Sequence, residues 1–261
     1  MNNLINQQLE NNILKITLNN PLAQNTLSLD IINNLKKIIL NADTNNEVKV
    51  VIIASTGKIF SAGHNLKEIN NHRKDQDKGL DFFTTLINNC SDLMLSIIHN
   101  SKPVIAEVNG VATAAGCQLV ASCDLAYASD ISKFATPGVN IGLFFSTPMV
   151  ALSRVVKNKH AMEMLLTGDF INADKAKSIG LINNSFKEQE LFNEINLIAN
   201  KLSKKSTLTL KIGKKAFYNQ SEMKITDAYK YASEVMIKNM MEKDSEEGIE
   251  AFIEKRKPNW N

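Results

Sequence analysis

Hydrophobic and polar residues alternate with two different periods along the first two thirds of the chain. Ile13–Leu18 alternates apolar and polar residues, which predicts a half-buried strand. Residues 48–54 form a nearly unbroken β-branched run and residues 103–108 a short apolar one, and both predict buried strands. Between these runs, residues 28–41 and 79–99 repeat their apolar positions at helical spacing. Alternating strands and helices predict an α/β layer architecture.

The pattern changes after about residue 185, where the strand signals stop. Four later segments all have the period of amphipathic helices: residues 191–202, 207–218, 225–241 and 245–255. We therefore expect two parts, an α/β core over residues 1–187 and a helical region over residues 188–261. The helical region is interpreted as an added layer or an oligomer contact.

The composition is that of an ordinary globular protein, with 44% hydrophobic and 22% charged residues. The net charge of +3 is small, and no stretch interleaves basic and aromatic residues, so a nucleic-acid partner is not expected. No apolar run approaches the roughly 18 residues of a membrane span. Residues 1–12 lack the features of a signal peptide. We expect a cytoplasmic protein, or one of an organelle matrix if a presequence is missing.

The three cysteines, Cys90, Cys117 and Cys123, form no CxxC pair and cannot all be bridged. They are interpreted as buried structural thiols in a reducing compartment. The histidines and cysteines lack the spacing of metal ligands, so no metal site is expected.

Two segments could carry chemistry. Residues 60–68 (FSAGHNLKE) follow a predicted strand, and residues 102–119 run from another strand through a turn of small residues into a helix that begins near Ala114. Small side chains there let a ligand approach the backbone closely. The amino end of a helix offers unpaired N–H groups and a positive dipole to negative charge. Either turn taken alone is equally typical of tight packing.

Together, the two segments resemble the crotonase superfamily, also called the enoyl-CoA hydratase and isomerase superfamily, and the resemblance covers nearly the whole chain. Residues 108–148 are similar to a narrower group within it, that of enoyl-CoA hydratase domain-containing protein 3. Other matching stretches are residues 18–21 (LNNP), 123–128 (CDLAYA), 165–169 (LLTGD), 173–181 and 251–257 (AFIEKRK).

The resemblance implies a spiral of repeated ββα units with a C-terminal helical trimerisation region. It also implies an acyl-CoA thioester as the substrate, within which coenzyme A is a part rather than a separate cofactor. The expected assembly is a homotrimer or a hexamer.

The resemblance further implies an oxyanion hole, formed by the backbone N–H groups of His64 and Ala115. Two such donors stabilise the enolate or tetrahedral oxyanion of a thioester, and the loss of one typically costs about 3 kcal/mol. In the family, the pantetheine and adenine path is lined by the residues that match His64, Ala62, Asn65, Leu66 and Lys67.

Near the carboxyl end, Phe252 and Lys255 match residues that reach the CoA of a neighbouring subunit. The alternative is that the basic residues 255–257 are a solvated helix end.

Two positions depart from the hydratases of this family, which hold a water between two glutamates. Those positions are Gln118 and Gly138 here. A glutamine amide can orient water but cannot accept a proton at neutral pH, and glycine has no side chain. The expected function is thus an acyl-CoA enzyme, nominally a hydratase or isomerase, for which standard hydration is doubtful. Thioester hydrolysis, decarboxylation and non-catalytic acyl-CoA binding are the alternatives.

Other side chains near these positions have two interpretations each. The His64 imidazole could transfer protons near neutral pH, or it could point away while its backbone acts. The hydroxyls of Thr136, Ser146 and Thr147 could bind water or substrate, or could serve in turns and caps. Asp124 could substitute for a missing acid or base, or could cap or pin the next strand.

Overall fold

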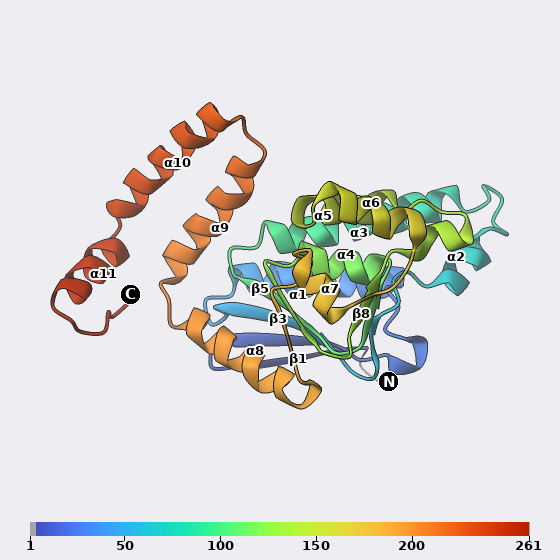
Figure 1. The fold of residues 1–261 in the computed structure, drawn as a ribbon, viewed down its shortest axis with the longest axis horizontal. Helices are drawn as coiled ribbons and strands as arrows, with labels where there is room; N and C mark the ends of the chain where they lie inside the picture. Colours follow the sequence, from blue (N-terminus) through green and yellow to red (C-terminus); the bar gives the residue numbers. More distant parts are fainter. Residues whose placement is uncertain (1–3, 261) are drawn as a thin grey trace.

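The computed structural model describes residues 4–260, which form two β-sheets covered by helices (Figure 1). The larger sheet contains β1 (Ile5–Glu10), β2 (Ile13–Leu18), β3 (Val50–Ser55), β5 (Val104–Val108), β7 (Leu125–Ser129) and β10 (Asn184–Phe186) in that spatial order. The smaller sheet contains β4 (Ile59–Ser61), β6 (Val111–Thr113), β8 (Lys133–Ala135) and β9 (Ile171–Asn172).

Three strand pairs give the fold its repeating character. In β3–β4, β5–β6 and β7–β8, the first strand joins the large sheet and the second joins the small one before the chain enters a helix. Equivalent strands of successive pairs lie side by side in parallel. The chain therefore winds as a spiral of ββα units, which confirms the predicted fold class.

The helices of the core are α1 (Leu29–Thr44), α2 (Leu66–His72), α3 (Leu80–Ile98), α4 (Ala115–Ser122), α5 (Ser146–Val155), α6 (Asn158–Thr167), α7 (Ala173–Ser178) and α8 (Glu188–Ser203). Two 3₁₀ turns, η1 (Pro21–Ala23) and η2 (Pro137–Ile141), join them. Ser28 caps α1 by accepting a hydrogen bond from the Ile31 N–H at 3.3 Å. None of the helices within residues 4–260 is long and apolar enough to cross a membrane.

Strand β3 is buried on both faces, because successive side chains of a strand point in opposite directions. Val51 and Ile53 belong to the main core beneath α1, α3 and α4. Val50 and Ile52 belong to a second cluster, which Leu191, Ile195 and Ala199 of α8 complete. Helix α8 thus packs on the face of the large sheet opposite the main core.

The cysteines lie within this buried interior. Cys90, Cys117 and Cys123 are all free and buried, which confirms the interpretation of structural thiols. Burial raises the pKa of Cys90 and of Cys117 to about 12. At neutral pH these thiols are protonated and unreactive.

The last three helices form an arm that extends away from the core (Figure 1, orange to red). They are α9 (Thr207–Ser221), α10 (Ile225–Met240) and α11 (Lys243–Ile253), and α10 runs back along α9. The three helices expected beyond residue 206 are therefore present. The arm exposes many large apolar side chains: Phe217, Ile225, Tyr229, Met236, Ile237, Met240, Met241, Ile249, Phe252 and Ile253.

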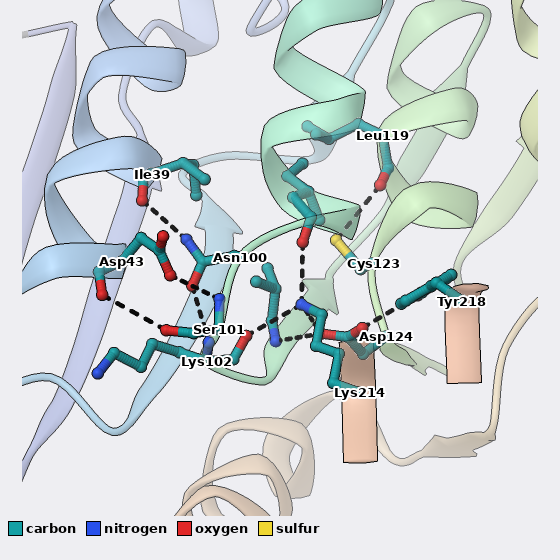
Figure 2. Close-up of polar contacts among 12 residues, drawn as sticks. Ile39, Asp43, Asn100, Ser101, Lys102, Leu119, Cys123, Asp124, Lys214 and Tyr218 are labelled. Carbon is teal, nitrogen blue, oxygen red and sulfur yellow. Dashed lines mark hydrogen bonds and ion pairs between the residues drawn. The ribbon is translucent and has the colours of Figure 1, made fainter. Parts of the chain in front are cut away.

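A buried ion pair fastens this arm to the core (Figure 2). Asp124 Oδ2 accepts hydrogen bonds from the Lys214 ammonium at 2.6 Å and from the Val104 N–H at 2.7 Å, and Oδ1 accepts one from the Tyr218 hydroxyl at 3.0 Å. The Lys214 ammonium also donates to the carbonyls of Ile97 and Lys102. Asp124 therefore holds the start of β5 and the helix α9, rather than the strand that follows it.

Replacing Lys214 with methionine keeps most of the side-chain volume but leaves the Asp124 carboxylate buried without its cation. The side chains of Lys214 and Asp124 are only 8% and 16% exposed. We therefore expect Lys214→Met to lower the free energy of unfolding by about 3 kcal/mol, as the breaking of a buried pair does. Urea denaturation measures the loss. Lys215→Met, an exposed neighbour on α9, is the control and should change stability by less than about 0.5 kcal/mol. Equal effects of the two substitutions would contradict this account.

Candidate functional site

The two segments singled out from the sequence meet at one edge of the small sheet. β4 and β6 are parallel neighbours, so the turns that follow them lie side by side. The Thr113 hydroxyl donates to the Ala62 carbonyl at 3.1 Å across this junction. A Cβ atom added to Gly63 would lie 2.6 Å from the Ala114 Cβ and 3.0 Å from the Ala115 nitrogen. With a φ of +84°, Gly63 is required both by its backbone conformation and by this contact.

The second turn presents the amino end of α4. Ala115 is the first residue of this helix, and the N–H at that position has no partner in the helix itself. The preceding residue, Ala114, has a φ of +54°, a conformation that costs a non-glycine residue about 1 kcal/mol or more. Its N–H donates to the Ala135 carbonyl at 3.0 Å, which fixes the turn. Gly116 lets α4 begin directly above β4, since a Cβ there would overlap the Ser61 carbonyl oxygen.

His64 uses its side chain and its backbone differently. The imidazole Nδ1 lies 3.3 Å from the Leu27 carbonyl oxygen, and the Leu27 N–H donates to the Gly63 carbonyl at 2.8 Å. Burial lowers the pKa of the imidazole, so the ring is neutral at pH 7 and its Nδ1–H is assigned as the donor to Leu27. The His64 backbone N–H forms no hydrogen bond within residues 4–260.

The residues after His64 form the start of α2. Asn65 caps this helix, because its Oδ1 accepts hydrogen bonds from the N–H groups of Lys67 and Glu68 at 3.1 and 3.3 Å. Leu66 and Lys67 are exposed beside it, and Ala62 is half-buried. These four residues thus flank His64 along the chain.

Phe252 and Lys255 do not join this group within one chain. Phe252 lies in the last turn of α11 and Lys255 just after that helix, in the arm, while α2 and α4 lie in the core (Figure 1). The Phe252 side chain is 86% exposed.

Gln118 lies one turn into α4, where its N–H donates to the Ala114 carbonyl at 3.0 Å. Helical side chains lean toward the amino end of their helix, so its carboxamide is directed back toward the Ala114–Ala115 turn. Gln118 is 4% exposed, and its Oε1 has no hydrogen-bond partner among the described residues.

Thr136 also has a buried side-chain oxygen without a hydrogen-bond partner among the described residues. It follows β8, whose Ala135 pairs with Thr113 of β6, so it lies next to the turn at Ala114. It is 1% exposed, and its Oγ1 also has no partner among the described residues. Ser146, by contrast, donates to the Phe144 carbonyl at 3.3 Å, which is an ordinary turn contact. An unsatisfied buried polar atom costs about 1–3 kcal/mol, so Gln118 Oε1 and Thr136 Oγ1 each have an unused capacity for a hydrogen bond.

Gly138 is enclosed by its neighbours in η2. A Cβ there would overlap the Leu143 carbonyl oxygen and the Phe145 ring, whose Cε1 would lie 2.6 Å away. A carboxylate side chain at residue 138 therefore does not fit unless both the Leu143 carbonyl and the Phe145 ring move. The role of Phe145 could not be found from the sequence, because the only signal was an aromatic residue in an apolar stretch.

No cluster of three or more His, Cys, Asp or Glu residues within residues 4–260 is placed to hold a metal ion.

Comparison with known proteins places this arrangement in a family. Residues 8–261 match the family model described as enoyl-CoA hydratase/isomerase, and the chain belongs to this family, the crotonases. The chain is 49% identical to the mitochondrial enoyl-CoA hydratase domain-containing protein 3 of Xenopus laevis over 253 residues, which are 97% of this chain and 84% of that protein.

Two crystal structures share the fold over nearly the full length of both chains. That of human enoyl-CoA hydratase domain-containing protein 3 has a TM-score of 0.94 at 44% identity and covers 99% of this chain and 100% of its own. That of an enoyl-CoA hydratase from Mycobacterium smegmatis has a TM-score of 0.94 at 42% identity, with 99% of each chain covered. The chain is therefore an enoyl-CoA hydratase-like protein that resembles the domain-containing protein 3 group.

The packing at Gly138 leads to a prediction about stability. Gly138→Ala is expected to lower the free energy of unfolding by about 2 kcal/mol, because the added methyl group overpacks the site. In a Phe145→Ala background the same change should cost less, so a double-mutant cycle in urea should show coupling of about 1 kcal/mol.

Gly213→Ala is the matched control, since a Cβ at that position of α9 meets nothing within 4 Å. It should leave stability unchanged or raise it slightly. A Gly138→Ala protein as stable as this control would show that the space at residue 138 is open.

Proposed function

We propose that this protein binds an acyl-CoA thioester and that the backbone N–H groups of His64 and Ala115 donate to its carbonyl oxygen. The observation that carries the proposal is the meeting of two turns at one sheet edge, each with an N–H that makes no hydrogen bond inside the described chain. Backbone donors held rigidly in a buried site stabilise negative charge better than water does, since they need no reorganisation. The membership of the enoyl-CoA hydratase/isomerase family supports the thioester as the ligand.

The path of the CoA is proposed to run over the start of α2. Ala62, Asn65, Leu66 and Lys67 flank His64 along the chain, and Lys67 is an exposed cation suited to a phosphate. Because the Asn65 Oδ1 already caps α2, its amide nitrogen is the group left for the ligand.

The proposed assembly is a homotrimer or hexamer, in which Phe252 and Lys255 contact the CoA bound by a neighbouring subunit. The exposed apolar side chains of α10 and α11 support this proposal, because a patch of that kind is typical of a surface that is covered in solution. The compartment stays a prediction between the cytoplasm and an organelle matrix; the name of the Xenopus relative, which says mitochondrial, favours the matrix.

The reaction that we propose depends on stabilisation of negative charge by the oxyanion hole rather than on proton transfer by carboxylates. Gln118 and Gly138 stand where the family's hydratases carry glutamates, and Phe145 fills the space beside Gly138. Gln118 and Thr136 hold a water or a substrate hydroxyl with their unpaired oxygens, but neither accepts a proton at neutral pH. We therefore favour thioester hydrolysis or decarboxylation over standard hydration, with non-catalytic acyl-CoA binding as the alternative.

The backbone donors can be tested by removing one of them. Ala115→Pro deletes the N–H at the first position of α4, a position where proline is tolerated in helices. We expect turnover of the best substrate in a panel of acyl-CoA esters, crotonyl-CoA included, to fall by about 100-fold, the effect of losing one oxyanion donor. Identification of the products decides which reaction occurs.

Ala115→Gly keeps the N–H and serves as the control, with a change of only a few fold expected. Thermal unfolding of both variants checks that they fold. The proposal is wrong if the folded proline variant turns over acyl-CoA as fast as the glycine variant. Binding of the esters by the parent without any turnover would point to the non-catalytic alternative.

A further inference from the structure

A polar pocket lies at the amino end of β5, away from the turns at His64 and Ala115. Its volume is about 430 Å³. Three parts of the chain line it: the end of α1, the loop before β5 and the first turns of α9. The residues that matter for its charge are Lys102, Lys211 and Asp43.

Lys102 brings a largely buried side chain to this pocket, with its ammonium at the pocket wall. The residue is only 6% exposed, and its ammonium makes no hydrogen bond or ion pair within residues 4–260. Its backbone is fixed, since the N–H donates to Asn100 Oδ1 at 2.9 Å and the carbonyl accepts from Lys214 at 3.0 Å. In Figure 2 the side chain runs away from the Asp124–Lys214 pair. The ammonium lines the pocket without a hydrogen bond or ion pair of its own, and a bound anion would supply its counter-ion.

Helix α9 supplies further positive potential. Lys211, which is exposed, lies one turn into the helix and lines the same pocket. The Ser206 hydroxyl oxygen accepts the Thr209 N–H at 3.0 Å, whereas the N–H groups of Thr207 and Leu208 have no partner in the described chain. Unpaired N–H groups at the amino end of a helix bind anions.

The one carboxylate in the pocket lining is already engaged. Asp43 Oδ1 accepts a hydrogen bond from the Ser101 N–H at 2.6 Å, and it forms no ion pair with Lys102. Burial lowers the pKa of Lys102, nearby Asp43 raises it, and Lys211 lowers it again. The pocket lining therefore carries two lysines and one carboxylate, while a second carboxylate, Asp244, accepts a hydrogen bond from the Ser206 hydroxyl behind the start of α9. The lining itself is positive on balance.

We propose that this pocket is a binding site for a phosphoryl group, which Lys102, Lys211 and the first turn of α9 hold together. A phosphoryl group suits these donors because its oxygens accept hydrogen bonds from several directions, as the donors here converge from separate elements. The site is separate from the thioester site and does not depend on the proposed function. Since the Lys102 carbonyl also accepts from Lys214, the ligand would sit beside the contact that fastens the arm to the core.

The test is calorimetric titration of the intact protein with inorganic phosphate at constant ionic strength, with thermal unfolding in parallel. We expect saturable binding and a phosphate-dependent rise of the melting temperature. Lys102→Met and Lys211→Met should each weaken the affinity at least tenfold. Lys215→Met, which alters an exposed lysine of the same helix outside the pocket, should bind like the parent.

Lys102→Met should also unfold near the temperature of the phosphate-free parent, since the Lys102 ammonium forms no hydrogen bond or ion pair within residues 4–260. If this variant fails to fold, the exposed Lys211→Met still decides the question. A second titration with CoA identifies the source of the phosphoryl group: weaker CoA binding by the lysine variants indicates a phosphate of CoA, and unchanged binding indicates a free phosphate. Absence of saturable phosphate binding by the parent, or unchanged phosphate affinity in Lys211→Met, would overturn the proposal. So would lysine variants that change only the oligomeric state.

Discussion

The close approach of the Gly63 turn to the amino end of α4 is the contact on which the candidate site depends. Parallel pairing of β4 with β6 brings the two turns to one edge of the small sheet, but only small residues allow them to touch. A Cβ at Gly63 would overlap the opposite turn, and a Cβ at Gly116 would overlap Ser61 at the end of β4. This contact places the N–H groups of His64 and Ala115 near each other without any demand on their side chains. The site can therefore persist while the side chains around it change.

Gln118 and Gly138 illustrate that freedom. Under the proposed function, the backbone donors polarise a thioester, while Gln118 and Gly138 supply no carboxylate that could move protons. Phe145 makes the loss structural at residue 138, because its ring occupies the space into which a side chain would grow. At the amino end of β5, the Asp124–Lys214 ion pair fastens the helical arm to the core. The proposed oligomer needs this arm to be held in place.

The sequence predicted the parts of the fold that have a clear period. The strand expected over Ile13–Leu18 has those bounds, and the helices of the arm begin and end within three residues of expectation. β1 was missed because only one of its six residues is buried, so it has no apolar alternation. The strands of the small sheet were missed because two or three residues are too few to show a period. The family was identified correctly from its motifs, whereas the roles of the site residues and the boundary at residue 187 stay predictions.

What the sequence could not supply are contacts that depend on how separate segments pack. Phe145 beside Gly138 depends on how η2 packs, and Lys102 meets Lys211 only because the arm is fastened next to β5. Neither contact can be recognised from the residues next to it in the sequence. Asp124 shows the limit in another way, since a position that follows a helix gives no sign that the carboxylate binds both β5 and α9.

The most direct measurement of the central claim is the infrared carbonyl stretch of a ¹³C-labelled acyl-CoA thioester bound to the protein. Two hydrogen bonds from the N–H groups of His64 and Ala115 would weaken the C=O bond, so the account predicts a stretch at clearly lower frequency than that of the same thioester in water. A bound thioester whose carbonyl absorbs at the frequency found in water would contradict it.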